Sequence, residues 1–417
     1  MNVSMMIARR LRLDGSAGSR ATVIIAVASV ALSLMVMEFT LAIVFGFKEG
    51  IRAKLSGFDA QVSVEAPLVR AGEVAVVDAD STLLAIVGEA LPEGASVRRT
   101  IRQPGLLKTD DNFEGVIFIG QSATGTSDGF DFEKGIVTDG VFPDFDADSC
   151  RNSAVISEPM AADLGLAVGD KVYATFIVDG NVRLRRLRVD GLYKSNFGEY
   201  DRTVAYTSMA GLQSVLGVDS MAATRLDIRG LEDSDVDEAA TRLQQTLVQA
   251  AADGRIDSYY PVSDIHRTGA LYFNWLALLD TNVVVIFILM LAVAAFTLVS
   301  SLFILVLERV RMIGVLRAIG ASRTMVRNIF VDLGMRLVGL GMIIGNVLGL
   351  GLLLVQQYTH AVPLDPEMYY LSSVPVLINL WAMLALHVGV AAVAAAVLLV
   401  PARMAASTSP AEVIAAD

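Results

Sequence analysis

The sequence predicts an α-helical membrane protein with four transmembrane helices and a large mixed α/β domain inserted between the first and second helices. Residues 281–307 contain no Asp, Glu, Lys or Arg, and as a helix they would cross the roughly 30 Å hydrocarbon core. Hydrophobic residues make up 54% of the chain and charged residues 18%, with a mean hydropathy of +0.56, which is high for a soluble protein. In residues 48–275, by contrast, short β-rich runs alternate with turn-forming residues, as in a soluble domain.

The N-terminal part is basic and then apolar. Residues 1–20 carry four arginines among apolar side chains, which predicts either an amphipathic helix on the membrane surface or a plain basic anchor. Residues 21–47 form the first predicted span, uncharged except for Glu38. Burying a lone ionisable group in a membrane costs free energy, so Glu38 is a candidate for a specific role. The alternative is that its side chain simply faces the bundle interior or reaches water.

Residues 48–275 alternate β-rich runs with breaks at Gly, Asp and Pro. Helices are expected over 79–90, 158–164 and 235–252, and an outer lobe over about 121–215. One face of the last helix is apolar, formed by Val236, Ala239, Leu243, Leu247 and Ala250.

Two motifs in this domain resemble functional sites but fail on context. Residues 125–129 fit the G-x-S-x-G pattern of hydrolases, yet no helix is predicted after them, so a turn is expected. Asp144, Asp146 and Asp148 have the spacing that opens a calcium loop, but the later ligand positions do not match, so a solvated acidic loop is expected. Cys150 is the single cysteine, which excludes an intrachain disulfide.

The charge balance and the absence of one sequence motif argue against some partners and cofactors. Residues 47–275 carry 35 acidic and 22 basic residues, which argues against nucleic acid. The chain has no G-x-x-x-x-G-K-[ST] motif and so no phosphate cradle of that kind for ATP. No catalytic residue, bound cofactor or metal site is expected.

The C-terminal part predicts three further spans. In order, it reads as span 276–307, basic connection 308–327, Gly-rich span 328–356, loop 357–374, span 375–400 and tail 401–417. Five arginines lie in 308–327 and no Lys or Arg in 357–374. The positive-inside rule therefore predicts cytoplasmic termini and a cytoplasmic 308–327, with the large domain and 357–374 on the outer side.

The run AAFTLVSSLFILVLERVRMIGVLRAIGASRTMVRNIF resembles the core block of the FtsX-like permease family. Three further stretches resemble its lipoprotein-releasing LolC/LolE branch, whose external domain is MacB-like: IARRLR with GFKEGIRAKLSGFDAQVSV, VISEPMAADLGLAVGDKVYATF with FGEYD, and LDPEMYYLSSVPV. The first span lacks the Gly-rich run usual in that branch.

This resemblance implies a mechanotransmission permease in the cell inner membrane, multi-pass, with a periplasmic domain. It implies a dimeric cytoplasmic ABC ATPase that holds ATP and Mg, a second permease protomer (the same chain or a paralogue), a lipoprotein substrate and a periplasmic carrier. The segment 308–327 would be the coupling helix on the ATPase; a basic membrane anchor is the alternative. The expected coupling residues are Glu308, Arg311, Ile313, Leu316, Arg317, Ile319, Gly320 and Arg323.

A lipoprotein would enter through a lateral gap between the outer ends of the first two spans. The expected gap residues are Phe39, Val44, Phe45, Leu276, Leu279 and Val283, although side chains that merely face lipid would look the same. Two other functions stay open: MacB-like export of periplasmic peptides or drugs, and FtsX-like regulation of a cell-wall hydrolase.

Overall fold

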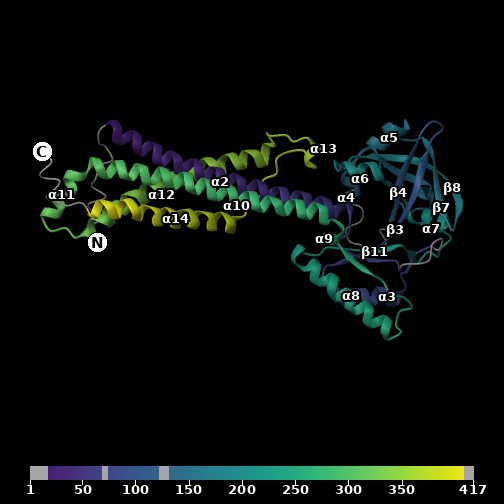
Figure 1. The fold of residues 1–417 in the computed structure, drawn as a ribbon. Helices are drawn as coiled ribbons and strands as arrows, with labels where there is room; N and C mark the ends of the chain where they lie inside the picture. Colours follow the sequence, from purple (N-terminus) through teal and green to yellow (C-terminus); the bar gives the residue numbers. More distant parts are fainter. Residues whose placement is uncertain (1–16, 68–73, 122–130, 408–417) are drawn as a thin grey trace. The chain divides into compact units, whose positions relative to one another are not determined.

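The computed structural model describes residues 17–67, 74–121 and 131–407 of the chain (Figure 1). It divides into two compact units. The helical unit takes its residues from Met1–Gly50, Trp275–Pro363 and Ser373–Asp417, and the α/β unit from Ile51–Asn274 and Leu364–Ser372. The G-x-S-x-G turn expected at 125–129 and most of the expected amphipathic N-terminal segment lie outside the described residues.

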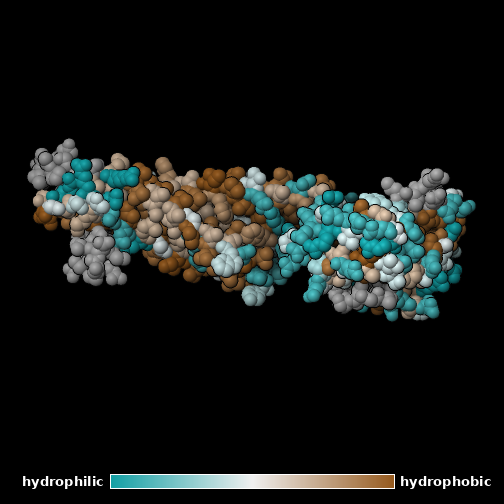
Figure 2. Space-filling view, turned by 90° about the horizontal axis from the view of Figure 1, so that it is seen from below, coloured by the Kyte–Doolittle hydropathy of each residue, from teal (hydrophilic) through white to brown (hydrophobic). Residues whose placement is uncertain are grey.

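The helical unit is built from long apolar helices. Within the described ranges, four are long and apolar enough to cross a membrane: α2 (Ala17–Phe58), α10 (Ala270–Glu308), α12 (Arg323–Thr359) and α14 (Leu380–Ser407). Hydrophobic side chains cover most of the visible face of this unit, whereas the α/β unit is mainly hydrophilic (Figure 2). The short helix α11 (Val310–Ala318) joins α10 to α12.

Glycines let α12 approach α2 closely. A Cβ on Gly341 would lie 2.8 Å from Val30 Cβ, and one on Gly345 would lie 2.6 Å from Ala31 O. Both distances are shorter than normal contacts, so a side chain at either position would push the helices apart. This agrees with the role of small residues in membrane helix packing.

The α/β unit is organised around one mixed sheet. Its ten strands in the described residues run in the order β12-β1-β11-β3-β4-β9-β6-β8-β5, and β7 pairs with both β3 and β8. The strands of this sheet are β1 (Val62–Glu65), β3 (Ser96–Lys108), β4 (Phe113–Gln121), β5 (Val137–Gly140), β6 (Ser153–Ser157), β7 (Lys171–Val178), β8 (Asn181–Tyr193), β9 (Val204–Ser208), β11 (Arg225–Arg229) and β12 (Val262–Asp264). A second, two-stranded sheet pairs β2 (Val77–Asp78) with β10 (Ala222–Ala223).

The three helices expected in this domain are confirmed. They are α3 (Ser81–Ala90), α5 (Glu158–Leu164) and α8 (Val236–Ala252), and all five residues of the expected apolar face of α8 are buried. In Figure 1, α3 and α8 lie side by side, and they are in contact. The other helices of the α/β unit are α4 (Asp131–Gly135), α6 (Gly198–Thr203), α7 (Met209–Leu216), α9 (Ile265–Thr268) and α13 (Pro366–Tyr369), with 3-10 turns at Asp148–Cys150 and Asp233–Asp235.

The segment expected to form an outer lobe shares its sheet with the flanking segments. β9 pairs in parallel with β4, and β7 pairs antiparallel with β3. One buried cluster contains Ile101 and Phe118 from β3 and β4 together with Ile156 and Phe176 from β6 and β7. The lobe is therefore joined to the rest by backbone hydrogen bonds and a common core.

Candidate functional site

The connection between α10 and α12 has a defined backbone. α10 ends at Glu308, α11 spans Val310–Ala318, and Gly320 then adopts φ +96°. That conformation favours glycine because a Cβ would be strained there. The Ser322 side chain accepts a hydrogen bond from Met325 N and so caps the start of α12. The basic segment 308–327 thus contains one short helix between two turns, and its last five residues already form the start of α12.

Two of the expected coupling residues face the chain itself. Ile313 is 1% exposed and packs in a cluster with Leu302, Phe330 and Ala402, which come from α10, α12 and α14. Arg317 donates from Nη1 to Ala406 O of α14, at 2.7 Å. Both residues hold α11 against the bundle.

The remaining expected coupling residues lie on the open side of this connection. Leu316 is half-buried, whereas Glu308, Arg311, Ile319, Gly320 and Arg323 are exposed. Val315, which the sequence reading did not single out, is also exposed. We call Arg311, Val315, Ile319 and Arg323 the α11 surface: two apolar side chains between two cationic ones.

The outer ends of α2 and α10 contact each other. Lys48 Nζ lies 2.5 Å from Asp280 Oδ1 and 2.6 Å from Oδ2, and the rings of Phe47 and Trp275 meet edge to face with centroids 6.0 Å apart. The sequence marks Asp280 as the end of an apolar span but gives no sign of its partner. These contacts join the two helices where a lateral gap is expected.

The expected gap residues do not all lie on this contact. Leu276 is buried, and Val44, Phe45, Leu279 and Val283 are half-buried. Phe39 packs against Ala42, Leu353 and Met383, a cluster shared with α12 and α14. That these residues line an entry gap stays a prediction.

A charged network surrounds the C-terminal end of α2 within the α/β unit. Asp59, one residue after α2, binds Arg102 of β3 at 2.7 Å and also Arg225 of β11. Arg225 Nε donates to Asp227 Oδ1 at 2.5 Å, and Thr100 Oγ1 donates to Asp227 Oδ2 at 2.9 Å. The sequence reading missed this network; the alternation Arg-Leu-Asp-Ile-Arg at 225–229, which puts three charges on one strand face, could have indicated it.

The network keeps its buried charges paired. Burial opposes the ionised form of Asp227, but the nearby arginines, Arg225 foremost, and the Thr100 hydrogen bond together outweigh this effect and hold the pKa of Asp227 below its ordinary value. Burial likewise opposes the charge on Arg225, and the carboxylates of Asp227 and Asp59 raise its pKa despite that. The end of α2 is therefore fixed to the sheet by ionised groups.

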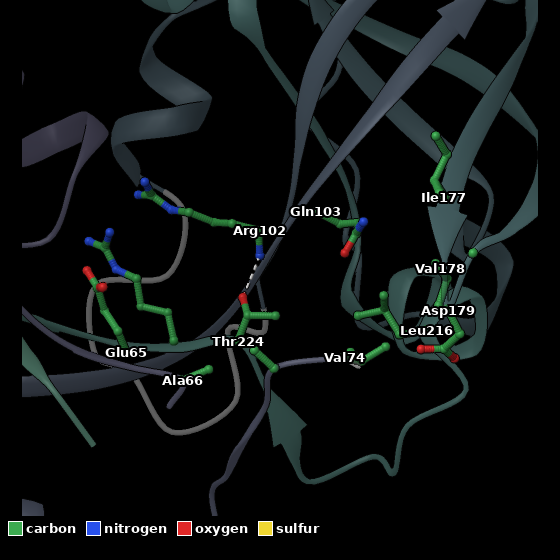
Figure 3. A pocket seen from close by; sticks show the side chains of 13 residues that line it. Glu65, Ala66, Val74, Arg102, Gln103, Ile177, Val178, Asp179, Leu216 and Thr224 are labelled. Carbon is green, nitrogen blue, oxygen red and sulfur yellow. Dashed lines mark hydrogen bonds between the residues drawn. The ribbon is translucent and has the colours of Figure 1, made fainter. Parts of the chain in front are cut away.

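A cleft of about 570 Å³ lies beside this network in the α/β unit. Figure 3 shows Arg102 and Thr224 on one side of it and Ile177, Asp179 and Leu216 on the other. Arg102 N donates to Thr224 Oγ1 at 2.8 Å, which fixes that wall (Figure 3). The lining mixes charged and apolar groups, and its chemistry indicates no particular ligand.

One face of the sheet carries several exposed apolar side chains in the part of the chain that the structure describes. Paired residues point to the same side of a sheet, and β4, β3, β7 and β8 are adjacent, with Leu106 opposite Thr175 and Thr175 opposite Leu184. We call this the outer sheet face; its exposed apolar members include Leu106, Phe113, Tyr173, Ile177, Val182 and Leu184. The exposed Lys108 and Arg186 lie on the same face, paired with Tyr173. The exposed fractions of these six apolar side chains range from 40% to 70%, so no described residue covers them.

Together these features define a class: a multi-pass helical membrane protein that carries a large α/β domain with an exposed apolar face. The family model described as MacB-like periplasmic core domain matches residues 18–246, and the one described as FtsX-like permease C-terminal matches residues 284–410. The chain belongs to the FtsX-like permease family with a MacB-like periplasmic core domain, which is a family of ABC transporter permeases. The resemblance expected from the sequence is confirmed.

Several curated relatives bear the name lipoprotein-releasing system transmembrane protein LolC. One from Xylella fastidiosa (strain 9a5c) is 30% identical over 236 residues, covering 53% of this chain and 54% of the relative. A second, from X. fastidiosa (strain Temecula1), is 29% identical over 62% of this chain and 64% of the relative. One from Neisseria meningitidis serogroup B is 31% identical over 43% of each chain. The aligned part thus spans about half the length of these relatives. Together with the apolar helices, they indicate an inner-membrane protein.

Two solved structures resemble part of the chain. The extracellular domain of the noncanonic ABC-type transporter YknZ from Gram-positive bacteria gives a TM-score of 0.33 at 15% identity, covering 49% of this chain and 100% of that one. The periplasmic region of MacB from Actinobacillus actinomycetemcomitans gives 0.33 at 13% identity, covering 51% and 92%. TM-scores of this size support no conclusion about the fold or function of this chain.

Proposed function

We propose that the chain is the permease subunit of an ABC transporter that extracts lipoproteins from the outer leaflet of the inner membrane and passes them to a periplasmic carrier. The observation that carries this is the outer sheet face, an exposed apolar surface on a domain outside the spans. Acyl chains leaving the membrane need such a surface to avoid water. The relatives named LolC, at about 30% identity, support the same substrate class.

The energetics require a partner that hydrolyses ATP. Each acyl CH₂ drawn out of lipid costs about 0.8 kcal/mol, so several chains need an external energy source. The chain has no phosphate-binding loop of the G-x-x-x-x-G-K-[ST] type, so ATP and Mg would bind a separate cytoplasmic ATPase dimer. The α11 surface, with apolar side chains flanked by Arg311 and Arg323, has the composition to dock on that ATPase.

Docking can be tested at Ile319, which is 77% exposed. Ile319→Asp is expected to prevent co-purification of the ATPase without impairing membrane insertion, because it places a charge in an apolar contact. Ile177→Asp is the matched control, since Ile177 is 69% exposed in the α/β unit and should leave the ATPase bound. If Ile319→Asp retained the ATPase as well as Ile177→Asp does, α11 would be only a membrane anchor.

The proposed orientation places 308–327 in the cytoplasm and 357–374 outside. A cysteine at Ser372, which is exposed, should then react with an impermeant thiol reagent in spheroplasts. A cysteine at Thr324, also exposed, should react only after lysis. The opposite pattern would reverse the orientation.

The substrate would enter between α2 and α10 once the Lys48–Asp280 and Phe47–Trp275 contacts part. Photocrosslinkers at Phe45 and Val283 should capture triacylated lipoprotein and lose it when the acyl chains are absent. A crosslinker at Ile343 of α12, which is 63% exposed and belongs to neither helix, serves as the control and should capture little. Equal capture of unacylated protein, or of soluble peptides only, would refute extraction and favour MacB-like export.

A further inference from the structure

Glu38 of α2 is a fully buried acid inside the helical unit. Its exposed fraction is 0%, and neither carboxyl oxygen has a hydrogen-bond partner among the described residues. Nε2 of His387, on α14, lies 3.3 Å from Glu38 Oε1. Gly349 of α12 closes the other side, because a Cβ there would clash with Glu38 Oε2. Three helices thus enclose one carboxyl group.

The contacts of His387 fix where its hydrogen lies. Nδ1 is 2.6 Å from Met383 O, and a carbonyl oxygen only accepts, so Nδ1 carries the hydrogen. Nε2 is 2.6 Å from Asn346 Nδ2, and an amide nitrogen donates, so Nε2 presents its lone pair. His387 is therefore neutral with this orientation of the Asn346 amide, and its lone pair faces both Asn346 and Glu38.

A neutral His387 requires a proton on Glu38. An ionised carboxylate would set Oε1 against the Nε2 lone pair, two acceptors with no hydrogen between them. A protonated carboxyl can instead donate from Oε1 toward Nε2, as the longer of two donors to that lone pair, at 3.3 Å against 2.6 Å for Asn346. The contact becomes attractive only when Glu38 holds its proton.

The side chains packed beside this part of α2 are apolar. Next to Glu38 along α2, Leu34 and Met37 form a cluster with Leu386 and Val390 of α14; Phe287, Met290 and Leu291 of α10 pack on it. Within the described residues, the ion pair found for Glu38 is the one with His387. Lys48 and Asp280 already pair with each other, and Lys48 lies ten residues further along α2, about 15 Å as a helix rises.

We propose that Glu38 and His387 form an intramembrane proton-binding site whose proton joins α2 to α14. When the helices part, water reaches the carboxyl, which gives its proton to that water as H₃O⁺ and becomes a carboxylate; closure takes one proton back. Since the joined state holds one more proton than the parted state, a rise in pH favours parting. The site would link proton uptake to the helix movements of the permease.

Infrared spectroscopy of the full-length protein in lipid nanodiscs tests this directly, without substrate. At neutral pH the wild type should show a carboxylic acid C=O band that is absent from Glu38→Gln and weakens as the pH is raised. Asp280→Asn is the control and should retain the band, because Asp280 is exposed and paired with Lys48. A spectrum unchanged by Glu38→Gln at neutral pH would overturn the proposal.

Two further measurements keep the test independent of how well Glu38→Gln folds. Glutamate labelled with ¹³C in the wild-type chain should shift the band, which excludes an aspartic acid as its source. His387→Gln should also move the band, since the acceptor for the Glu38 proton changes. An unshifted band in both cases would assign it to another group and refute the site.

Discussion

Two buried acids, Asp227 in the α/β unit and Glu38 in the helical unit, differ in how their charge is handled. Both have an exposed fraction of 0%. Asp227 accepts hydrogen bonds from Arg225 and Thr100, so it can remain ionised. Glu38 pairs with His387, and among the described residues both of its oxygens lack a hydrogen-bond partner.

The difference shows what a buried acid can contribute. An acid supplied with a cation and a hydroxyl fixes two elements together at any ordinary pH. An acid supplied only with a neutral acceptor depends on its own proton, and so its contribution can be switched. The first arrangement suits the attachment of α2 to the sheet, and the second suits helices that must move.

The largest expected effect comes from removing the charge of Asp227. Asp227→Asn leaves the buried Arg225 guanidinium with Asp59 but without the second carboxylate that balances its charge. The α/β unit should therefore lose about 3–5 kcal/mol of stability. Thermal unfolding of the full-length protein, followed by limited proteolysis of this unit, measures the loss.

A surface ion pair supplies the control for that variant. Arg242 binds Glu238 at 2.5 Å one helical turn away on α8, and both side chains are more than half exposed. Arg242→Gln should therefore change stability by no more than about 1 kcal/mol. If Asp227→Asn were equally mild, the paired network would not be what fixes α2 to the sheet.

An intermediate effect is expected at Gly349. Gly349→Ala inserts a methyl group against the Glu38 carboxyl and should destabilise the helical unit by about 1–3 kcal/mol through overpacking. Gly351→Ala, on the same helix, meets nothing within 4 Å and should be neutral or slightly stabilising. Equal thermal stability of the two variants in detergent would show that the carboxyl group does not lie against α12.

The smallest expected effect concerns a partly exposed cluster. His266 lies 2.8 Å from Asp237 and 3.3 Å from Asp233, which also binds Arg52. Burial lowers the pKa of His266, but the hydrogen bonds to the two carboxylates outweigh it and raise that pKa above its ordinary value.

The raised pKa sets the sign of the pH effect. Protonated His266 should stabilise the fold fully below its unfolded pKa of about 6.5, and the effect should disappear as the pH rises through the folded value. The gain should be about 0.2–1 kcal/mol, as for exposed pairs. His266→Gln should remove this pH dependence; if unfolding temperatures of wild type and variant ran parallel from pH 5 to 9, the cluster would contribute nothing.

Local patterns predicted much of the fold. The apolar periodicity of α8 and the uncharged run in α10 are properties of adjacent residues, so both elements were found from the sequence. The partners of Glu38, Asp59 and Asp280 lie far along the chain, and nothing local to an acid identifies its partner. The same limit applies to Ile313, whose inward packing depends on three other helices.

ATP-driven release from proteoliposomes is the measurement that tests the proposed function most directly. The permease, with the ATPase that co-purifies with it, would be reconstituted with triacylated lipoprotein and supplied with a soluble carrier and ATP. The account predicts that acylated lipoprotein moves to the carrier only while ATP is hydrolysed. Release that proceeds equally without ATP hydrolysis, or ATP-driven movement of soluble peptides with the lipoprotein left in the membrane, would contradict it.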